Sequence, residues 1–521
     1  MIAETSDLYR RPTFVDLVSR SLQRYPDRVA FATPSGDMSY DELRRLIARI
    51  AAALQDGGVK SGDGLALLSP NRPEAFAALM AAQSLGAHYT PLHPMGSMAD
   101  HVTVCADAGI TAIIADEPQY AEHAATLAAQ LETRPQVFLL GGGSQSDVLA
   151  DRESDGVIPT LARESDLALL GYTGGTTGRP KGVMLSHRSL VTHLFLTVAH
   201  WQLPTDLRFL GSTPLTHALV GMVPPVFHQG GTIVLTKGFD PAEFCRLVET
   251  HRITATFLVP SMIYVLLDHV AEHPADLSSL QTILYGAAPM SPDRLKQALD
   301  VFGPVFVQFY GQSEAPNTVT TLSKEDHDLS RPERLASCGK PHPALDVAVL
   351  DDDDQPCAIG ELGEVCVRGP LLMDGYWQQP EVTAETLRNG WLHTGDVGRF
   401  DKDNFLYLTD RKKDMLITGG FNVYPRDVED ALVTHPEVAA AAVIGVPDPK
   451  WGEAVTAFVV STPGATVTPS ELIALVRELK GPVHAPKRLE FVDAVPLTPL
   501  GKVDKKQLRA RFWDEHDRAV N

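Results

Sequence analysis

The sequence predicts an α/β protein with a large N-terminal domain of α/β layers, a β-rich subdomain and a small α+β unit at the C-terminal end. Three observations support this fold class. Short apolar runs alternate with segments of helical spacing through the first part of the chain. From about residue 340, short strands separated by acidic or glycine-containing turns take over. The 521 residues exceed what one compact core holds, so two or more domains are expected.

The N-terminal elements alternate between helix and strand. Ser39 and Glu42 form a capping box, and apolar residues then recur at helical spacing until Gly57 ends the helix. Pro73 opens a second helix that runs to about Gly86. Short apolar runs predict buried strands at 65–68, 112–114, 137–140, 232–235 and 255–259. Strands that alternate with helices in this way predict a parallel sheet with helices on its faces.

Three further strands end in small or polar residues. They lie in the segments 209–217, 282–289 and 305–314, with Tyr310 and Glu314 at the last tip. In open α/β sheets, ligands bind at the carboxyl ends of the strands. The sequence therefore predicts that these three tips converge near one ligand site.

A loop rich in glycine and threonine precedes these tips and lies between the apolar runs 167–170 and 183–185. Residues 173–182 hold four glycines, three threonines and the cations Arg179 and Lys181. Backbone N–H groups in such a loop cradle anions, and threonine hydroxyls add donors. The loop departs from the Walker pattern, because its lysine follows a proline and precedes no Ser or Thr. It therefore predicts a polyphosphate site outside the ordinary P-loop ATPases.

The C-terminal part of the chain has a different pattern. Short strands are predicted at 346–350, 363–368, 404–408, 438–446 and 455–460. The first three alternate with short turns, which suggests antiparallel sheet. The charged segment 410–414 suits a linker. Beyond it, Pro425 starts a helix, and the capping box from Thr468 to Glu471 starts another.

Composition and charge exclude several classes of function. The formal net charge is −20, so the surface repels nucleic acid and anionic lipid. The five cysteines are scattered without CxxC spacing, which indicates reduced thiols in a cytoplasmic protein and no metal-ligand cluster. The N-terminus lacks the pattern of a signal peptide, and no apolar run approaches the ~18 residues of a membrane span.

Five motifs resemble those of one superfamily. They are Thr173–Gly182, Tyr310–Glu314, Thr394–Asp396, Asp410–Arg411 and Pro499–Lys502. Their order and rough spacing are similar to those of the adenylate-forming enzymes, which include acyl-CoA synthetases, 4-coumarate–CoA ligases, firefly luciferase and peptide-synthetase adenylation domains. The resemblance covers essentially the whole chain. Residues 419–425 and 451–453 resemble the acid–CoA ligase branch of that superfamily.

The resemblance implies two half-reactions. A carboxylate attacks the α-phosphate of ATP, which gives acyl-AMP and pyrophosphate, and coenzyme A then forms the thioester and releases AMP. It also implies an ATP- and acyl-binding domain over 1–412 and a small mobile lid domain over 413–521. The expected ligands are ATP, Mg²⁺, coenzyme A and a small-molecule carboxylic acid. Neither nucleic acid nor a transmembrane segment is expected, and a homodimer would be compatible with the sequence.

The resemblance also assigns roles to single residues. The catalytic residues would be Lys502, which bridges the carboxylate and the α-phosphate, His217 at the acyl pocket, and Glu314. ATP or AMP would be bound by Thr173, Gly174, Gly175, Thr176, Thr177, Gly178, Lys181, Gly286, Ala287, Ala288, Tyr310, Gly311, Gln312, Ser313, Asp396 and Arg411. Within this set Tyr310 would stack on adenine and Asp396 would accept from the ribose. Thr173 and Glu314 would hold Mg²⁺, Lys413 would be the hinge, and Gly419, Gly420 and Lys487 would contact coenzyme A.

Some positions depart from the commonest family pattern. Gly174 stands where serine is usual, Ser313 replaces threonine, and Thr216 precedes His217 where phenylalanine is frequent. The last difference changes the shape of the acyl pocket and leaves the acyl group open.

The acyl pocket should come from residues 213–240, 285–290 and 310–319. Its apolar members are Leu215, Ala218, Leu219, Met222, Val223 and Phe239, which predict an apolar fatty or aryl acid as substrate. Two other hypotheses share the ATP residues. One is a stand-alone adenylation enzyme that loads a carrier-protein thiol, and the other is a non-catalytic nucleotide-binding protein on the same scaffold.

Overall fold

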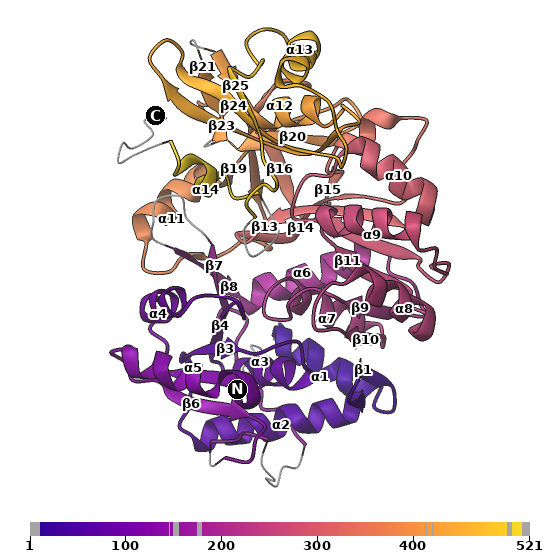
Figure 1. Cartoon of the computed structure of the whole chain (residues 1–521). Helices are drawn as coiled ribbons and strands as arrows, with labels where there is room; N and C mark the ends of the chain where they lie inside the picture. Colours follow the sequence, from indigo (N-terminus) through magenta and orange to yellow (C-terminus); the bar gives the residue numbers. More distant parts are fainter. Residues whose placement is uncertain are drawn as a thin grey trace.

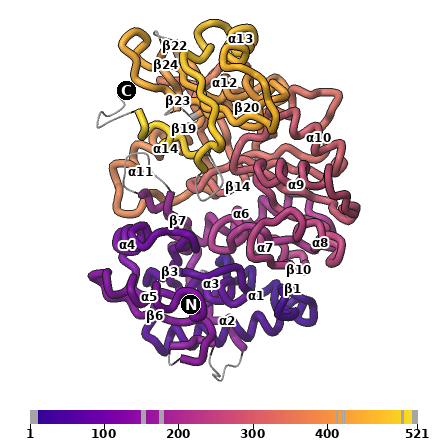
Figure 2. Tube along the Cα trace, viewed as in Figure 1, coloured from indigo at the N-terminus to yellow at the C-terminus, as the bar shows by residue number. Residues whose placement is uncertain are grey.

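A computed structural model shows an α/β protein built on four sheets (Figure 1). The structure describes residues 11–144, 146–149, 156–173, 180–411, 414–418, 421–497 and 503–512. Figure 2 shows that the chain fills the lower half of the view with its N-terminal residues and the upper half with its C-terminal ones. The alternation of helix and strand in the first part of the chain confirms the predicted fold class.

The largest sheet has nine strands in the order β15-β14-β13-β12-β11-β9-β10-β1-β2. In that order the strands are Lys340–Pro341, Ala315–Leu322, Phe306–Gln312, Thr282–Gly286, Ala255–Leu258, Arg208–Gly211, Thr232–Leu235, Val29–Thr33 and Gly36–Ser39. The six from β13 to β1 pair in parallel, and β14 and β2 are antiparallel to their neighbours. The carboxyl ends of β9, β12 and β13 therefore meet at one edge of this sheet.

The second sheet has seven strands in the order β18-β8-β7-β4-β3-β5-β6. They are Gly375–Tyr376, Lys181–Ser186, Leu167–Thr173, His88–Pro91, Gly64–Leu68, Ala112–Asp116 and Gln136–Leu140. The strands from β7 to β6 are parallel, whereas β7, β8 and β18 pair antiparallel. The short strand β18 thus brings a segment from far along the chain to the base of the glycine- and threonine-rich loop.

Helices cover the faces of these two sheets. They are α1 (Phe14–Arg24), α2 (Tyr40–Asp56), α3 (Pro73–Ser84), α4 (Met98–Asp107), α5 (Glu117–Gln130), α6 (His187–His200), α7 (Ala218–His228), α8 (Pro241–His251), α9 (Pro260–Glu272) and α10 (Pro292–Phe302). The predicted capping box of α2 is present, since Ser39 accepts from the Glu42 N–H. Helix α3 is apolar on every side and buried along its length, as expected for a helix enclosed between layers.

Aromatic rings join the two large sheets into one core. Phe227 of α7 contacts Phe76 of α3, with ring centroids 5.6 Å apart, and Phe31 of β1, at 5.3 Å. Tyr40 of α2 also packs on Phe227, at 5.1 Å. These rings prefer edge-to-face contact and contribute large buried areas. The sheet that carries the strand tips is therefore held rigidly against the sheet that carries the phosphate loop.

The C-terminal part contains two smaller sheets. The four-stranded one has β16 (Asp346–Leu350), β17 (Gly363–Arg368), β19 (Leu392–Phe400) and β20 (Leu406–Arg411), all antiparallel. Short helices flank this region: η2 (Pro332–Ala336), α11 (Pro380–Thr386) and η3 (Arg388–Gly390). The predicted strand at 404–408 is displaced, because residues 401–405 form the turn before β20. The predicted linker at 410–414 therefore begins inside this strand.

The last sheet follows β20. Its strands are β21 (Leu416–Thr418), β22 (Phe421–Val423), β23 (Val438–Asp448), β24 (Gly452–Ser461) and β25 (Arg488–Phe491), and its helices are α12 (Pro425–Leu432), α13 (Pro469–Lys480) and α14 (Lys505–Arg509). The capping box of Thr468 and Glu471 starts α13 as predicted. The backbone N–H of Arg426 in α12 donates to Asp410 at 2.9 Å, which ties this unit to β20. The boundary predicted at 412/413 lies outside the described residues.

Buried histidines make the fold sensitive to acid. Burial lowers the pKa of several imidazoles from 6.5 to about 4, namely His88, His187, His193, His217 and His327. Because the unfolded chain binds more protons than the folded chain between these values, stability is full above about pH 6.5 and falls as the pH drops toward 4. Each such group contributes up to about 1.4 kcal/mol per pH unit inside this window.

We therefore expect the melting temperature to fall by several degrees between pH 6.5 and pH 5, before most carboxylates titrate. Scanning calorimetry at constant ionic strength measures it. His327 has a carbonyl partner, Ser323, and a hydroxyl partner, Tyr285, so a glutamine there can keep both hydrogen bonds. The variant His327→Gln should lose less stability over this pH range than the wild-type chain. A melting temperature that stays flat down to pH 5 would contradict the expectation.

Candidate active site

The three predicted strand tips lie at the same edge of the nine-stranded sheet. Strands β12 and β13 are neighbours, and Gly286 pairs with Phe309 at their ends. Strand β9 lies two places further along and leads into residues 212–217. Parallel strands present their carboxyl ends together, so the sheet brings these segments together as expected.

At the end of β12 the backbone packs very closely against the neighbouring strand β13. A Cβ on Gly286 would lie 2.5 Å from the carbonyl oxygen of Phe309, so only glycine fits between β12 and β13. Ala287 follows with φ +65°, a left-handed conformation that costs free energy for alanine. Backbone strain of this kind concentrates at ligand sites. Residues 286–288 thus lie at the tip where the sequence placed the nucleotide, with Ala287 exposed.

Tyr310 and Asp396 form a buried hydrogen-bonded pair at the next tip. The hydroxyl of Tyr310 donates to Oδ2 of Asp396 at 2.7 Å, although the two residues are 86 positions apart. Both residues are buried. Burial raises the pKa of Tyr310 well above its ordinary value, so the hydroxyl stays protonated and remains a donor. The structure thus joins two residues that the sequence assigned to one nucleotide; the stacking of adenine on Tyr310 stays a prediction.

The part of β19 that carries Asp396 is held in place by a carboxylate that the sequence did not indicate. Glu364 of β17 accepts the Gly395 N–H at 2.9 Å and lies 3.2 Å from Nδ1 of His393. The Thr394 hydroxyl accepts the Asp396 N–H at 3.1 Å and donates to the strand β17. Gly395 has φ +72°, which suits glycine. These contacts fix the direction in which the Asp396 carboxylate points.

Glu314 lies at the meeting point of the two large sheets. The hydroxyl of Tyr376 donates to Oε1 of Glu314 at 2.8 Å, and the Met373 N–H donates to its carbonyl oxygen at 2.9 Å. The ammonium of Lys181 lies 5.1 Å from the centroid of the Tyr376 ring. Strand β18 therefore links Glu314 to the phosphate loop. Sequence patterns did not single out Tyr376, because its role follows from the pairing of β18 with β8.

The ends of the phosphate loop are held by an antiparallel strand pair. Thr173 of β7 lies opposite Lys181 of β8, and its hydroxyl lies 3.5 Å from the Lys181 carbonyl oxygen. The loop residues Gly174, Gly175, Thr176, Thr177 and Gly178 lie outside the described residues. Their predicted contacts with phosphate stay predictions, and the structure describes only the two strands that carry them.

His217 is the N-cap of α7 and lies beside a second histidine. Its Nδ1 is 2.9 Å from the Thr216 hydroxyl, and its ring centroid is 4.9 Å from that of His93. The pKa of His217 is lowered to about 4, mainly by burial and to a smaller extent by the neighbouring His93. At neutral pH the imidazole is therefore neutral, with one N–H donor and one acceptor. His93 was not found from the sequence.

The C-terminal candidates are described in part. Lys413, Gly419, Gly420 and Lys502 lie outside the described residues, and for Arg411 the structure describes the backbone, which pairs with Asp396 across β19 and β20. The Lys487 ammonium donates to the carbonyl oxygens of Pro482 and Ala485 at 3.1 and 2.9 Å. These bonds hold Lys487 on its own domain, so its contact with coenzyme A stays a prediction that requires the side chain to turn outward.

The predicted apolar lining of the acyl pocket is largely core. Leu215, Leu219, Met222 and Val223 are each at most 1% exposed. Ala218 is partly exposed, and Phe239 packs beside Phe244 in the core behind α8. The predicted lining residues Leu215, Leu219, Met222 and Val223 therefore belong to the buried core.

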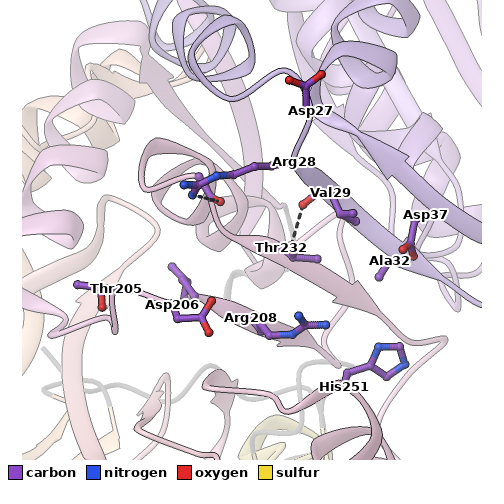
Figure 3. A pocket seen from close by; sticks show the side chains of 12 residues that line it. Asp27, Arg28, Val29, Ala32, Asp37, Thr205, Asp206, Arg208, Thr232 and His251 are labelled. Atoms are coloured by element: carbon purple, nitrogen blue, oxygen red, sulfur yellow. Dashed lines mark hydrogen bonds between the residues drawn. The ribbon is translucent and has the colours of Figure 1, made fainter.

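A different pocket lies at the opposite edge of the nine-stranded sheet, where β1, β9 and β10 begin (Figure 3). It has a volume of about 690 Å³ and is lined by the carboxylates of Asp27, Asp37 and Asp206 and by Arg28 and Arg208. Charges of both signs alternate there, whereas ligands of parallel sheets bind at the carboxyl ends. The nucleotide site predicted at the strand tips is therefore distinct from this pocket.

Within the described part of the chain, no group of three or more His, Cys, Asp or Glu side chains is placed to hold a metal ion. Among the helices within the same residues, none is long and apolar enough to cross a membrane.

Comparison with known proteins gives a consistent result. The AMP-binding enzyme family matches residues 18–377, and the AMP-binding enzyme C-terminal domain matches residues 427–502. The chain is 44% identical to the medium/long-chain-fatty-acid–CoA ligase FadD8 of Mycobacterium tuberculosis, over 99% of this chain and 93% of that protein. It is 40% identical to a feruloyl-CoA synthase of an Amycolatopsis species, over 91% of this chain and 94% of that one.

Among solved structures, the amide bond synthetase McbA of Marinactinospora thermotolerans is similar, with a TM-score of 0.89 and 37% identity. The similarity covers 96% of this chain and 100% of that one. It extends over both the large sheets and the small C-terminal unit.

Proposed function

This chain belongs to the AMP-binding enzyme family, and we propose that it is an ATP-dependent carboxylic acid–CoA ligase that acts on an apolar fatty or aryl acid. Enzymes of this family use ATP and, in the acyl-CoA ligases, coenzyme A. The observation that carries the proposal is the Tyr310–Asp396 pair at the strand tips, next to the chain of contacts from Lys181 through Tyr376 to Glu314. Together these residues offer a carboxylate that can accept hydrogen bonds from the ribose hydroxyls, and a cation and a carboxylate near the phosphates.

In the first half-reaction, the acid attacks the α-phosphate of ATP and pyrophosphate leaves. Positioning and neutralisation of developing negative charge supply most of the catalysis in such a step. Asp396, held by Tyr310, accepts from the ribose hydroxyls and fixes the nucleotide. Lys181 and the loop N–H groups neutralise the leaving pyrophosphate. With Nδ1 accepting from the Thr216 hydroxyl, the neutral His217 donates its Nε2–H toward the acid, and Lys502 bridges the two reactants.

Mg²⁺ fits the residues at the Glu314 tip. Hard cations prefer oxygen ligands, and the Glu314 carboxylate and the Thr173 hydroxyl are of this kind. Oε1 of Glu314 accepts one hydrogen bond from Tyr376, and the carboxylate keeps further lone pairs with which it would hold the ion. When bound, Mg²⁺ would neutralise charge on the phosphates.

In the second half-reaction, the sulfur of coenzyme A attacks the acyl carbonyl carbon and AMP leaves. We assign residues 1–412 to the ATP- and acyl-binding domain and 413–521 to a lid that alternates between the two steps about Lys413. Closure by a lid keeps the reactive acyl-AMP from water. Gly419 and Gly420 would then line the path of the thiol.

The surroundings of the cysteines fit a reducing compartment. None of the five thiols is in a disulfide, and Cys105, Cys245, Cys338 and Cys366 are buried. We therefore propose a cytoplasmic enzyme. A homodimer is the oligomeric state we would test first, by light scattering.

The direct test is ATP–pyrophosphate exchange against a panel of short, medium and long fatty acids, benzoates, cinnamates and steroid-derived acids. We expect exchange with at least one class, followed by thioester formation when coenzyme A is added. Transfer to a carrier-protein thiol in preference to coenzyme A would favour the carrier-loading alternative. No exchange by folded protein with Mg²⁺ present would contradict the proposal and favour the non-catalytic alternative.

A further inference from the structure

A polar pair lies among apolar residues beside the strand tips, where α6 packs against α7 and β14 (Figure 1). His193 of α6 is 3% exposed, and its Nε2 lies 3.3 Å from the amide nitrogen of Asn317 in β14. The Thr197 hydroxyl lies 3.5 Å from the same ring nitrogen. Neither His193 nor Asn317 has a part in the proposed adenylation chemistry.

The pair keeps hydrogen-bonding capacity for a ligand. Burial lowers the pKa of His193 to about 4, so at neutral pH the ring carries one donor and one acceptor. The Asn317 amide has two N–H groups and one carbonyl oxygen, and His193 takes only one of these. Asn317 is partly exposed. A neutral pair of this kind matches a neutral oxygen group that both donates and accepts.

The backbone around Asn317 is shaped to present this side chain. Its φ is +53°, in the left-handed region that asparagine tolerates better than most residues. A Cβ on Gly311, at the predicted nucleotide tip, would lie 2.6 Å from the backbone nitrogen of Asn317. The two backbone segments are therefore closely packed. Strained backbone next to a nucleotide tip is typical of binding positions.

Gly221 of α7 lies directly against the pair and brings no side chain to it. A Cβ there would lie 3.5 Å from the Asn317 amide nitrogen and 3.5 Å from Cε1 of His193, an ordinary contact distance. Alanine would therefore fit, and it is a better helix former than glycine. The glycine is locally unfavourable for α7, and it leaves the pair without a side chain packed against it at this point.

The position along α7 gives the size of the ligand. His217, which would meet the carboxylate, is the N-cap of this helix, and Gly221 lies four residues further on. Residues at this spacing share one helix face and are about 6 Å apart along the axis. This is the span of a benzene ring with its two para substituents. With the carboxylate at His217, as proposed, the polar pair would lie about one ring beyond it.

A rigid aromatic wall limits the site behind His193. Trp201 is 1% exposed, stacks on Phe309 with ring centroids 4.9 Å apart, and meets the His193 ring edge-on at 6.0 Å. Stacked and buried rings of this kind do not give way easily. The wall favours an acid that ends near the pair over a long flexible chain that must pass it.

We propose that His193 and Asn317 recognise a hydroxyl or carbonyl group on the acid, so that the substrate is an oxygenated ring acid and not an unsubstituted fatty acid. The inference rests on the proposed ligase function and adds the substrate class. A site built to hydrogen-bond such a group is left with unpaired polar atoms when the analogue lacks it. That loss is worth about 10- to 100-fold in kcat/KM.

The test compares matched acids in ATP–pyrophosphate exchange and in thioester formation. The pairs are 4-hydroxybenzoate with benzoate and 4-hydroxycinnamate with cinnamate, with octanoate and palmitate as alkyl acids. We expect the hydroxylated member of at least one pair to have a kcat/KM at least about 10-fold higher. Higher kcat/KM for the unsubstituted members or for palmitate would overturn the inference and leave the ligase function standing. No exchange and no thioester with any of these acids would overturn both the inference and the proposed ligase function.

Two variants test the residues themselves. Asn317→Gly removes the amide and keeps the φ of +53° without strain, so the preference for the hydroxylated acid should collapse toward a ratio of about one. Gly221→Ala should do the same by covering the pair. The matched control is Asn389→Gly, an exposed asparagine that also has φ +53° and lies in η3, which should keep the wild-type ratio. An unchanged ratio in both Asn317→Gly and Gly221→Ala would refute the assignment.

Discussion

Replacement of Lys502 by alanine should lower acyl-AMP formation by about 10³-fold and leave thioester formation from supplied acyl-AMP largely intact. The lysine would place its charge where the phosphoryl oxygens gather negative charge as the carboxylate attacks. A fixed cation in such a place stabilises the transition state more than the bound reactants. On the proposed alternation, the lid would turn before the second half-reaction, so the same side chain would no longer be at the reacting atoms.

The surrounding structure indicates that this loss would be chemical and not a loss of folding. Lys502 itself lies outside the described residues, but Leu497 and Val503 on either side of the segment pair in a short bridge. The following helix α14 is anchored by the ion pair of Lys505 with Glu429, at 2.9 Å. Both of these contacts persist without the Lys502 side chain.

The control for this experiment is Lys506→Ala. Lys506 is an exposed lysine of α14, four residues from Lys502, and its removal leaves the anchor of Lys505 intact. It should keep both half-reactions near the wild-type rates, with an unchanged melting temperature. Equal losses in both half-reactions for Lys502→Ala would contradict the alternation of the lid.

Local sequence rules predicted the elements well, because strands and helix starts depend on neighbouring residues. The capping boxes at Ser39 and Thr468 and the strands at 346–350 and 363–368 all appear where the pattern placed them. The convergence of the strand tips followed from one general property of parallel sheets. The start of β20 was displaced, because Asp401 caps a turn whose hydrogen bonds are not visible as a hydrophobic pattern.

The sequence did not indicate the side-chain contacts that form when strands far apart in the chain pair with each other. Tyr376 reaches Glu314 only because β18 joins β8, and Glu364 supports Asp396 only because β17 lies beside β19. The contact of His193 with Asn317 spans 124 positions. Each of these residues looks ordinary in its own segment, so periodicity and motif spacing carry no signal for it.

Replacement of Asp396 by alanine should raise the KM for ATP in pyrophosphate exchange by at least about 100-fold, with a smaller fall in kcat. Two charge-assisted hydrogen bonds to the ribose would be lost, each worth about 1.5–3 kcal/mol. The Tyr310 hydroxyl would also lose its acceptor inside the protein, which costs a further ~1–3 kcal/mol of stability. The melting temperature should therefore fall as well.

Tyr310→Phe separates these two effects. It removes the hydroxyl that holds Asp396 but keeps the ribose acceptor, so the KM for ATP should rise only a few-fold. The double variant should cost less than the sum of the single ones, because the residues act as one unit. A Tyr310→Phe variant as damaged as Asp396→Ala would mean that the hydroxyl itself contacts the nucleotide.

A second pair of the same chemistry shows whether stability alone accounts for the result. The Tyr407 hydroxyl donates to Asp401 at 3.2 Å in the turn between β19 and β20, away from the strand tips. Asp401→Ala should lower the melting temperature, since that carboxylate also accepts from the turn backbone. It should leave the KM for ATP unchanged. If the two aspartate variants raised the KM for ATP equally, Asp396 would be a structural residue and the ribose would be bound elsewhere.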